Sequence, residues 1–353
     1  MAGLGSPLLV LIFLAAAAVT WVAGISLSKT TDSLDARFGL GDELGGLILL
    51  AVAGYLPEFA ITISAAASGN LPLAAGNLIG GIAIQTMVLL LCDYAVGPAR
   101  PLTYLVGRLT PVLEGLLVII LVAEVEMGAL LKPSTAIGGV VSPASVGIVV
   151  IWFVGLFLIN KASRDPRWKV TMPGSSPGRR RRERSRPEQP HPFASSSTTR
   201  VALLFGLASA ITLVAGVALE ESGNELANRA GINGVIFGAT VLATATALPE
   251  ISSGLAAVRL GDHALAMGDI FGGNAFQVCL FLVADLVAGK PVLPSAGGNL
   301  NAWLGALGVA LTAIYGFGVI GRPEHTHARL GPDSLVALAL FGLGIAGLFF
   351  IPP

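Results

Sequence analysis

Ten stretches of about 20 mostly apolar residues run along this chain, and they constrain its fold more than any other feature. A helix of that length crosses the hydrocarbon core of a bilayer, and it satisfies its own backbone groups there. Charged residues make up only 12% of the chain, about half the share that is usual in soluble domains. We therefore predict an all-α integral membrane protein with ten transmembrane helices, at residues 7–27, 44–67, 72–96, 109–127, 138–160, 201–220, 232–258, 263–288, 301–320 and 333–351.

One long polar segment, residues 161–200, separates the fifth and sixth predicted helices. It contains eleven of the 21 Lys and Arg residues, including the run Arg179–Arg182, together with several prolines. Such a composition is typical of a disordered linker. Basic residues concentrate on the cytoplasmic side of membrane proteins, so we predict a cytoplasmic linker whose arginines could also contact anionic lipid. The only Lys and Arg residues that then fall outside are Lys132, Arg229 and Lys290.

Ten spans around a cytoplasmic linker place both termini outside the cell in a multi-pass protein of the cell membrane. No Lys or Arg precedes Lys29, so the first apolar stretch is predicted to be a membrane helix rather than a secretory signal. The chain then divides into a five-helix half at 1–160, the linker at 161–200 and a second five-helix half at 201–353.

An internal repeat relates the two halves at a constant offset of 192 residues. The segments Ala51–Gln85 and Ala243–Gln277 align without a gap, and 14 of their 35 positions are identical. Five predicted helices separate equivalent positions, so the second copy enters the membrane from the opposite side. We therefore predict two inverted repeats, an arrangement typical of transporters that open alternately to either face.

The repeat carries one Pro-Glu step in each half, at Pro57–Glu58 and Pro249–Glu250. A carboxylate near the bilayer centre costs about 2.5–3.5 kcal/mol, so it needs compensation. Proline removes a backbone hydrogen bond and frees a carbonyl one turn earlier. Hard cations bind carboxylate and carbonyl oxygens together. The pair is therefore predicted to bind cations, and a buried carboxyl that stays protonated is the alternative.

Small and amide residues follow each Pro-Glu step. Glycines spaced four or five residues apart are predicted to let the helices approach closely; they are Gly76, Gly80 and Gly81 in the first copy and Gly268, Gly272 and Gly273 in the second. Gln85 and Gln277 come one turn later, where their amide oxygens are expected near the carboxylates.

The two copies resemble the α-repeats of the sodium/calcium exchanger family, within the calcium/cation antiporter superfamily, as a divergent, bacterial-type member. The family pattern is Gly-Thr-Ser-x-Pro-Glu, followed by Gly-(Asn/Asp)-x-x-Gly-Ser-Asn-x-x-(Asn/Asp). The second copy has Ala-Thr-Ala-Leu-Pro-Glu over 245–250 and Gly-Asp-Ile-Phe-Gly-Gly-Asn-Ala-Phe-Gln over 268–277. The resemblance implies that Glu58 and Glu250 are the central cation ligands and that Gln85 and Gln277 occupy the family's Asn/Asp ligand positions. Of the other motif residues, Thr246 and Asn274 are kept and complete the predicted site.

Most motif hydroxyls of the family are absent. The corresponding residues are Gly54, Tyr55, Gly81, Ala247 and Gly273. Because the resemblance implies that these hydroxyls help to bind sodium, exchange coupled to protons becomes a plausible alternative. Tyr55 is expected to narrow the site.

These observations predict a secondary active cation antiporter that exchanges calcium or another divalent cation for sodium or protons by alternating access. Ca²⁺, Na⁺ or H⁺ would be cargo, and we expect no cofactor, no enzymatic activity and no nucleic-acid partner. The alternatives are sodium/proton exchange without calcium, a passive cation channel, and an intramembrane aspartyl protease suggested by Gly261–Asp262 and Gly268–Asp269. The protease lacks a matching Tyr-Asp helix, because the chain reads Asp93–Tyr94.

Further acidic residues lie towards the predicted helix ends. Asp93 and Asp285 obey the same offset and are interpreted either as interfacial helix ends or as entry carboxylates, one on each face. A second acidic group falls on the predicted outer side and is interpreted as solvated helix ends, with attraction of cations as the alternative; it comprises Glu124, Glu126, Glu220, Glu221 and Glu225.

Overall fold

The computed structural model describes the whole chain except residues 2, 39–51, 165–192, 194, 297 and 352–353. Most of the predicted linker, including its arginine run and any contact of that run with lipid, therefore lies outside the described residues. The described part is helical, and its only β-structure consists of two isolated bridges. The principal helices are α1 (Ser6–Phe38), α3 (Leu56–Ser68), α4 (Leu71–Val96), α6 (Thr110–Ala129), α7 (Pro143–Arg164), α9 (Thr198–Ala230), α12 (Leu248–Leu260), α13 (His263–Gln277), α14 (Leu280–Ala288), α16 (Asn299–Gly321) and α17 (Pro332–Gly347).

Seven described helical segments are long and apolar enough to cross a membrane, and a bent pair over 234–260 makes an eighth. They coincide with eight of the ten predicted spans. The predicted span 109–127 is helix α6, which carries three acidic residues, Glu114, Glu124 and Glu126. The predicted span 44–67 lies partly outside the described residues. Ten spans in two repeats therefore remain a prediction, whereas the described residues confirm a helical fold with several helices long and apolar enough to cross a membrane.

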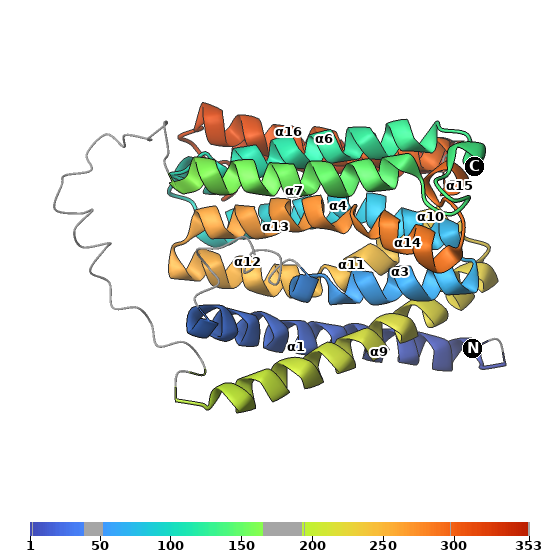
Figure 1. Cartoon of the computed structure of the whole chain (residues 1–353). Helices are drawn as coiled ribbons and strands as arrows, with labels where there is room; N and C mark the ends of the chain where they lie inside the picture. Colours follow the sequence, from blue (N-terminus) through green and yellow to red (C-terminus); the bar gives the residue numbers. More distant parts are fainter. Residues whose placement is uncertain (2, 39–51, 165–192, 194, 297, 352–353) are drawn as a thin grey trace.

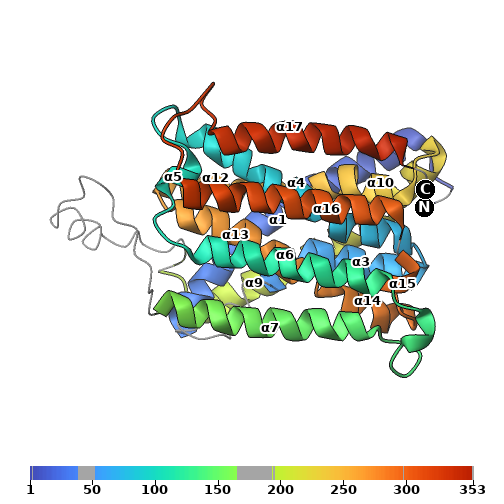
Figure 2. The same cartoon turned by 90° about the horizontal axis from the view of Figure 1, so that it is seen from above.

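The helices form one bundle with α4 and α13 at its centre (Figures 1 and 2). Within the span Leu71–Val96, 78% of the most apolar window is buried, compared with 22% for Pro143–Arg164. Helices such as α7 and α9 therefore present apolar side chains on the outside, as a bilayer requires. Both termini lie at one end of the bundle, and the ends of α7 and α9 that flank residues 165–192 lie at the other (Figure 1).

Proline and glycine set the bounds of α3 and α12. Pro57 and Pro249 lie in the first turn of these helices, where a missing N–H breaks no helical bond. Both helices end at a left-handed glycine, Gly69 with φ 79° and Gly261 with φ 78°, a conformation that glycine adopts without strain. Each proline therefore lies at the start of a helix and not inside one, so the expectation of a helix that continues through Pro57 or Pro249 is wrong. In the second half, the pair Gly234–Thr246 and Leu248–Leu260 is bent by 45° at Ala247.

Irregular backbone precedes α12. A π-helical turn over Gly238–Leu242 joins α10 (Gly234–Phe237) to α11 (Ala243–Thr246), and such turns occur frequently at functional sites. This segment packs closely on α4. A Cβ added at Gly80 would lie 2.2 Å from the Cβ of Ala239, and one added at Gly76 would lie 2.4 Å from the carbonyl oxygen of Val235. These two glycines therefore have the packing role that their spacing predicts.

Candidate cation site

Glu58 and Glu250 occupy the first turns of α3 and α12. These helices begin near the middle of the bundle and run towards opposite ends of it (Figure 1). The two side chains are buried, with exposed fractions of 0% and 5%, and their carboxyls lie close enough for their charges to interact. A helix N-terminus favours negative charge, so the fold places two acids where each backbone supports an anion.

Glu58 is the better hydrogen-bonded of the two. Gln85 donates from Nε2 to Glu58 Oε1 over 3.2 Å, whereas Thr246 donates from Oγ1 to the carbonyl of Ala243 over 3.2 Å. The structure thus brings Glu58 of α3 and Gln85 of α4 into direct contact. Among the described residues, no hydrogen bond from another side chain reaches the carboxyl of Glu250.

Gln277 and Asn274 lie on α13 and bond to α4 instead of to a carboxyl. Gln277 donates from Nε2 to the carbonyls of Asn77 and Leu78 over 3.2 and 2.7 Å. Asn274 donates from Nδ2 to Thr86 Oγ1 over 3.2 Å. Both amides are buried, and these bonds leave their carbonyl oxygens unused.

Several buried oxygens at this centre have no hydrogen-bond partner: Oε2 of Glu58 and Glu250, Oε1 of Gln85 and Gln277, Oδ1 of Asn274 and the phenolic oxygen of Tyr55. Buried polar atoms normally find partners, and oxygen is the ligand that hard cations prefer. Nowhere in the described chain do three or more His, Cys, Asp or Glu side chains group so that they could hold a metal ion. A cation here would therefore bind the two carboxyls together with amide or hydroxyl oxygens.

Tyr55 fills space beside the pair. Only 4% of its surface is exposed, and its ring meets Phe276 edge to face at 6.2 Å. A Cβ added at Gly273 would lie 1.6 Å from the Tyr55 oxygen. Tyr55 and a serine at position 273 could therefore not coexist in this packing.

A family model described as sodium/calcium exchanger protein matches residues 8–159 and 200–351. The chain belongs to the sodium/calcium exchanger family. This exchanger is 26% identical over 261 residues to inner membrane protein YrbG of Escherichia coli (strain K12), covering 74% of this chain and 72% of YrbG. It is 23% identical over 272 residues to the putative antiporter CaxA of Alkalimonas amylolytica, covering 77% and 78%.

Solved structures show the same fold. The H⁺/Ca²⁺ exchanger CAX superposes with a TM-score of 0.68 at 16% identity, over 98% of this chain and 82% of CAX. The sodium-calcium exchanger NCX_Mj, soaked with Na⁺ and Sr²⁺, superposes with a TM-score of 0.59 at 16% identity, over 97% and 99%. The chain is therefore a multi-pass cation antiporter of the cell membrane. Members of the family are transporters, which leaves the protease alternative without support.

Two glycines of this exchanger belong to the surroundings of the site and were not predicted. Gly24 of α1 and Gly216 of α9 are 192 residues apart. A Cβ at Gly24 would lie 2.7 Å from Pro249, and one at Gly216 would lie 3.0 Å from the carbonyl oxygen of Pro57. Each outer helix thus packs on the Pro-Glu helix of the other half. The signal was present in the sequence, since residues 20–24 read TWVAG and residues 212–216 read TLVAG.

Asp93 and Asp285 are buried structural links in this exchanger rather than entry carboxylates. Asp93 accepts the backbone N–H groups of Leu102 and Gly331 over 2.6 and 2.7 Å. Asp285 accepts those of Val292 and Ser142 over 2.6 and 2.8 Å. Both oxygens of each carboxyl are therefore already occupied by the chain.

The prediction that Glu220 is a solvated helix end is wrong. Helix α9 continues ten residues beyond position 220, to Ala230. Glu220 is fully buried and accepts hydrogen bonds from Ser64 over 2.7 Å and from Asn70 over 2.9 Å. It joins α9 to the end of α3.

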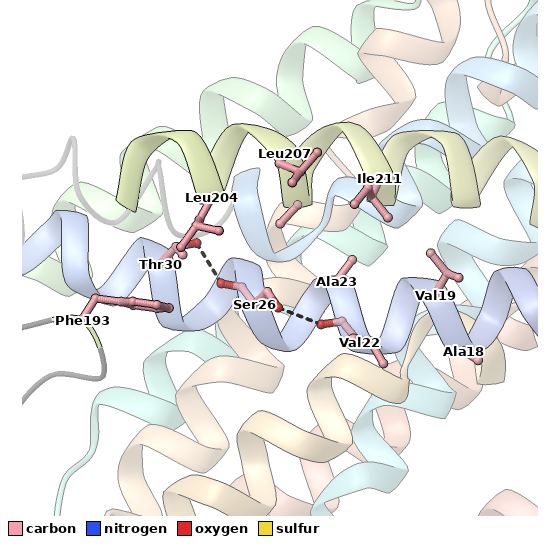
Figure 3. A pocket seen from close by; sticks show the side chains of 11 residues that line it. Ala18, Val19, Val22, Ala23, Ser26, Thr30, Phe193, Leu204, Leu207 and Ile211 are labelled. Carbon is pink, nitrogen blue, oxygen red and sulfur yellow. Dashed lines mark hydrogen bonds between the residues drawn. The ribbon is translucent and has the colours of Figure 1, made fainter. Parts of the chain in front are cut away.

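A groove of about 450 Å³ lies between α1 and α9 (Figure 3), and neither Glu58 nor Glu250 lines it. Its wall is mainly apolar and includes Val22, Leu204, Leu207 and Ile211. The hydroxyls of Ser26 and Thr30 are turned to the backbone of their own helix. The groove offers apolar contact and no cation ligands.

Proposed function

We propose that this exchanger transports calcium or another divalent cation against sodium or protons, by alternating access at Glu58 and Glu250. The observation that carries the proposal is the convergence of two buried carboxyls, from helices that run to opposite ends of the bundle, each with one oxygen that has no partner. A pair of anions inside a membrane is costly unless cations neutralise it. The pair therefore suits a cargo of positive charge.

The predicted ligand set is Glu58, Glu250, Gln85, Gln277, Thr246 and Asn274. Gln85 already contacts Glu58, and the amides of Gln277 and Asn274 present unpartnered oxygens from α13. The cations are substrates in this proposal, and no resident cofactor takes part.

Two inverted five-helix halves provide the movement in this proposal. The family model matches two segments that start 192 residues apart, and α3 and α12 run in opposite directions. The relation between Gly24 and Gly216, each against the other half's proline, is what a twofold axis in the membrane plane would produce. We place both termini outside the cell and the predicted linker, residues 161–200, in the cytoplasm, because basic residues concentrate on the cytoplasmic side of membrane proteins.

The scarcity of side-chain hydroxyls at the motif positions bears on which counter-ion is used. Thr246 keeps its motif hydroxyl, whereas Gly54, Gly81, Ala247 and Gly273 have none. Protons need no hydroxyl ligands and can bind the two carboxyls directly. Proton-coupled transport is therefore the form that these residues suit best.

The test is flux into liposomes that contain the purified full chain. Calcium-45 and sodium-22 uptake are measured with an imposed pH gradient, with an imposed sodium gradient, and with neither. We expect uptake of calcium-45 to require a counter-ion gradient. Sodium-22 uptake driven by pH without calcium-45 uptake would favour sodium/proton exchange, and uptake without any counter-ion would favour a channel.

Substitutions assign the site. Glu58→Gln and Glu250→Gln keep the volume but remove the charge, and each is expected to abolish exchange. Glu221→Gln is the matched control, because Glu221 is exposed on α9. Full transport by both site variants would refute the assignment.

A further inference from the structure

The two glutamines of the repeat, Gln85 and Gln277, are identical in sequence but differ in position. Gln277 lies over Gly81: a Cβ added there would lie 2.4 Å from Gln277 Nε2. We call the space beside the α-carbon of Gly81, or of its equivalent Gly273, the seat. From the seat over Gly81, the amide of Gln277 donates to the carbonyls of Asn77 and Leu78. The offset of 192 assigns Gln85 the matching seat over Gly273, beside the carbonyls of Asp269 and Ile270.

Tyr55 occupies that matching seat. Its phenolic oxygen lies where a Cβ of Gly273 would be, at 1.6 Å from the ideal position. Gln85 is found elsewhere, with Nε2 donating to Glu58 over 3.2 Å. The residue equivalent to Tyr55 in the other half is Ala247, whose single methyl group cannot fill the seat over Gly81. Gln277 therefore keeps its seat, whereas Gln85 does not.

We infer that Tyr55 is a positioning residue that makes the two glutamates unequal, because it excludes Gln85 from α13 and directs the amide to Glu58. Hydrogen bonds donated to a carboxylate hold and stabilise it. Glu58 has one such donor, Gln85, whereas among the described residues Glu250 has none from another side chain.

The consequence is an unequal pair of ligands, which rests on the proposed function. Gln85 holds the carboxyl of Glu58 in one orientation. Among the described residues no other side chain donates to the carboxyl of Glu250, so no such contact fixes its orientation. A symmetric pair would present both carboxyls in the same way, whereas this centre presents Glu58 already oriented.

The decisive measurement is a double-mutant cycle on the full chain in detergent, read as the calcium-45 concentration at half-maximal binding. Gln85→Ala should weaken binding about tenfold, the effect of one hydrogen bond to a charged group. In a Tyr55→Ala background the amide of Gln85 can bond to α13 instead of to Glu58, so Gln85→Ala should then weaken binding less than it does in the wild type. Gln277→Ala is the matched control, and its effect should be the same in both backgrounds.

A conservative variant separates packing from chemistry. Tyr55→Phe keeps the ring in the seat, so it should bind calcium-45 as the wild type does and preserve the tenfold effect of Gln85→Ala. If Tyr55→Phe behaves as Tyr55→Ala does, the hydroxyl itself acts in the site and the positioning role is refuted. An equal effect of Gln85→Ala in the wild-type and Tyr55→Ala backgrounds would also overturn the inference.

A structure of the Tyr55→Ala variant, determined by electron cryo-microscopy, tests the inference without any cargo. We expect Gln85 Nε2 within hydrogen-bond distance of the carbonyl of Asp269 or Ile270; an amide that stays on Glu58 would contradict the inference. The two proposals can be refuted separately. If Glu58→Gln still binds calcium-45, the proposed function is refuted. If Glu58→Gln loses binding but the effect of Gln85→Ala does not depend on residue 55, only the role of Tyr55 is refuted.

Discussion

Asp285 joins three parts of the chain through one carboxyl. It lies in the last turn of α14 and accepts the N–H of Val292 at one oxygen and that of Ser142, just before α7, at the other. In Asp285→Asn, one oxygen becomes an NH₂ group. That group faces a backbone N–H, so two donors meet and one hydrogen bond is lost. Because this backbone N–H is buried, it cannot form a replacement hydrogen bond with solvent.

The magnitude follows from these contacts. A hydrogen bond to a charged group contributes about 1.5–3 kcal/mol, and a buried donor left without a partner costs about 1–3 kcal/mol. These two contributions overlap, so we expect the free energy of unfolding to fall by about 3 kcal/mol. For a chain of this size that corresponds to a melting temperature lower by about 5 °C. Asp93→Asn should behave in the same way, since it replaces the equivalent contacts to Leu102 and Gly331.

The assay uses the protein's own thiols. Cys92 and Cys279 are buried, so a maleimide dye in detergent reports unfolding as the two cysteines become accessible. Glu324→Gln is the control, because its ion pair with Arg100 is exposed and should not change the melting temperature measurably. If Asp285→Asn melts within about 1 °C of the wild type, the two backbone contacts do not hold the helix ends as we reason.

Two further predictions concern glycines, each with a control elsewhere in the chain. Gly216→Ala should reduce exchange in liposomes, because its Cβ would meet α3 at Ala60 and Pro57, whereas Gly206→Ala on the same helix has nothing within 4 Å and should be neutral. Gly80→Ala should lower the melting temperature because its Cβ would overlap Ala239, yet its repeat equivalent Gly272 has open space and should accept alanine. Equal effects within either pair would contradict the packing described.

The sequence predicted the apolar helices correctly, because a membrane-crossing helix follows from apolar length. It did not predict that new helices begin at Leu56 and Leu248, since the spans 44–67 and 232–258 were each expected to continue through the proline. The prediction of helix ends was less accurate, because it stopped at the first charges. Glu220 was assigned to solvent on that ground, although α9 continues for almost three turns and turns this side chain towards Ser64.

The hydrogen-bond partners of the site residues could not be predicted from the sequence. Gln85 and Gln277 occupy equivalent positions in the repeat, so the pattern predicted equivalent surroundings for them. Their surroundings differ because Tyr55 reaches Gly273 on α13, whereas its equivalent, Ala247, is too short to fill the space over Gly81 on α4. Such a contact depends on the packing of the whole bundle, and local pattern contains no information about it.

Some contacts keep the repeat symmetry and others break it. Gly24 and Gly216 each pack on the Pro-Glu helix of the other half, and Asp93 and Asp285 each accept two backbone N–H groups. Gly80 and Gly272 break the symmetry between helices, because only Gly80 meets a neighbouring helix. Tyr55 breaks it at the centre, because it meets Gly273 whereas its equivalent, Ala247, is not among the atoms nearest to Gly81. If the two halves alternate as proposed, the matched contacts of the outer helices let either half move in the same way, and one set of central ligands serves both faces. A single side chain at the centre can therefore make two identical glutamates unequal while those matched contacts are kept.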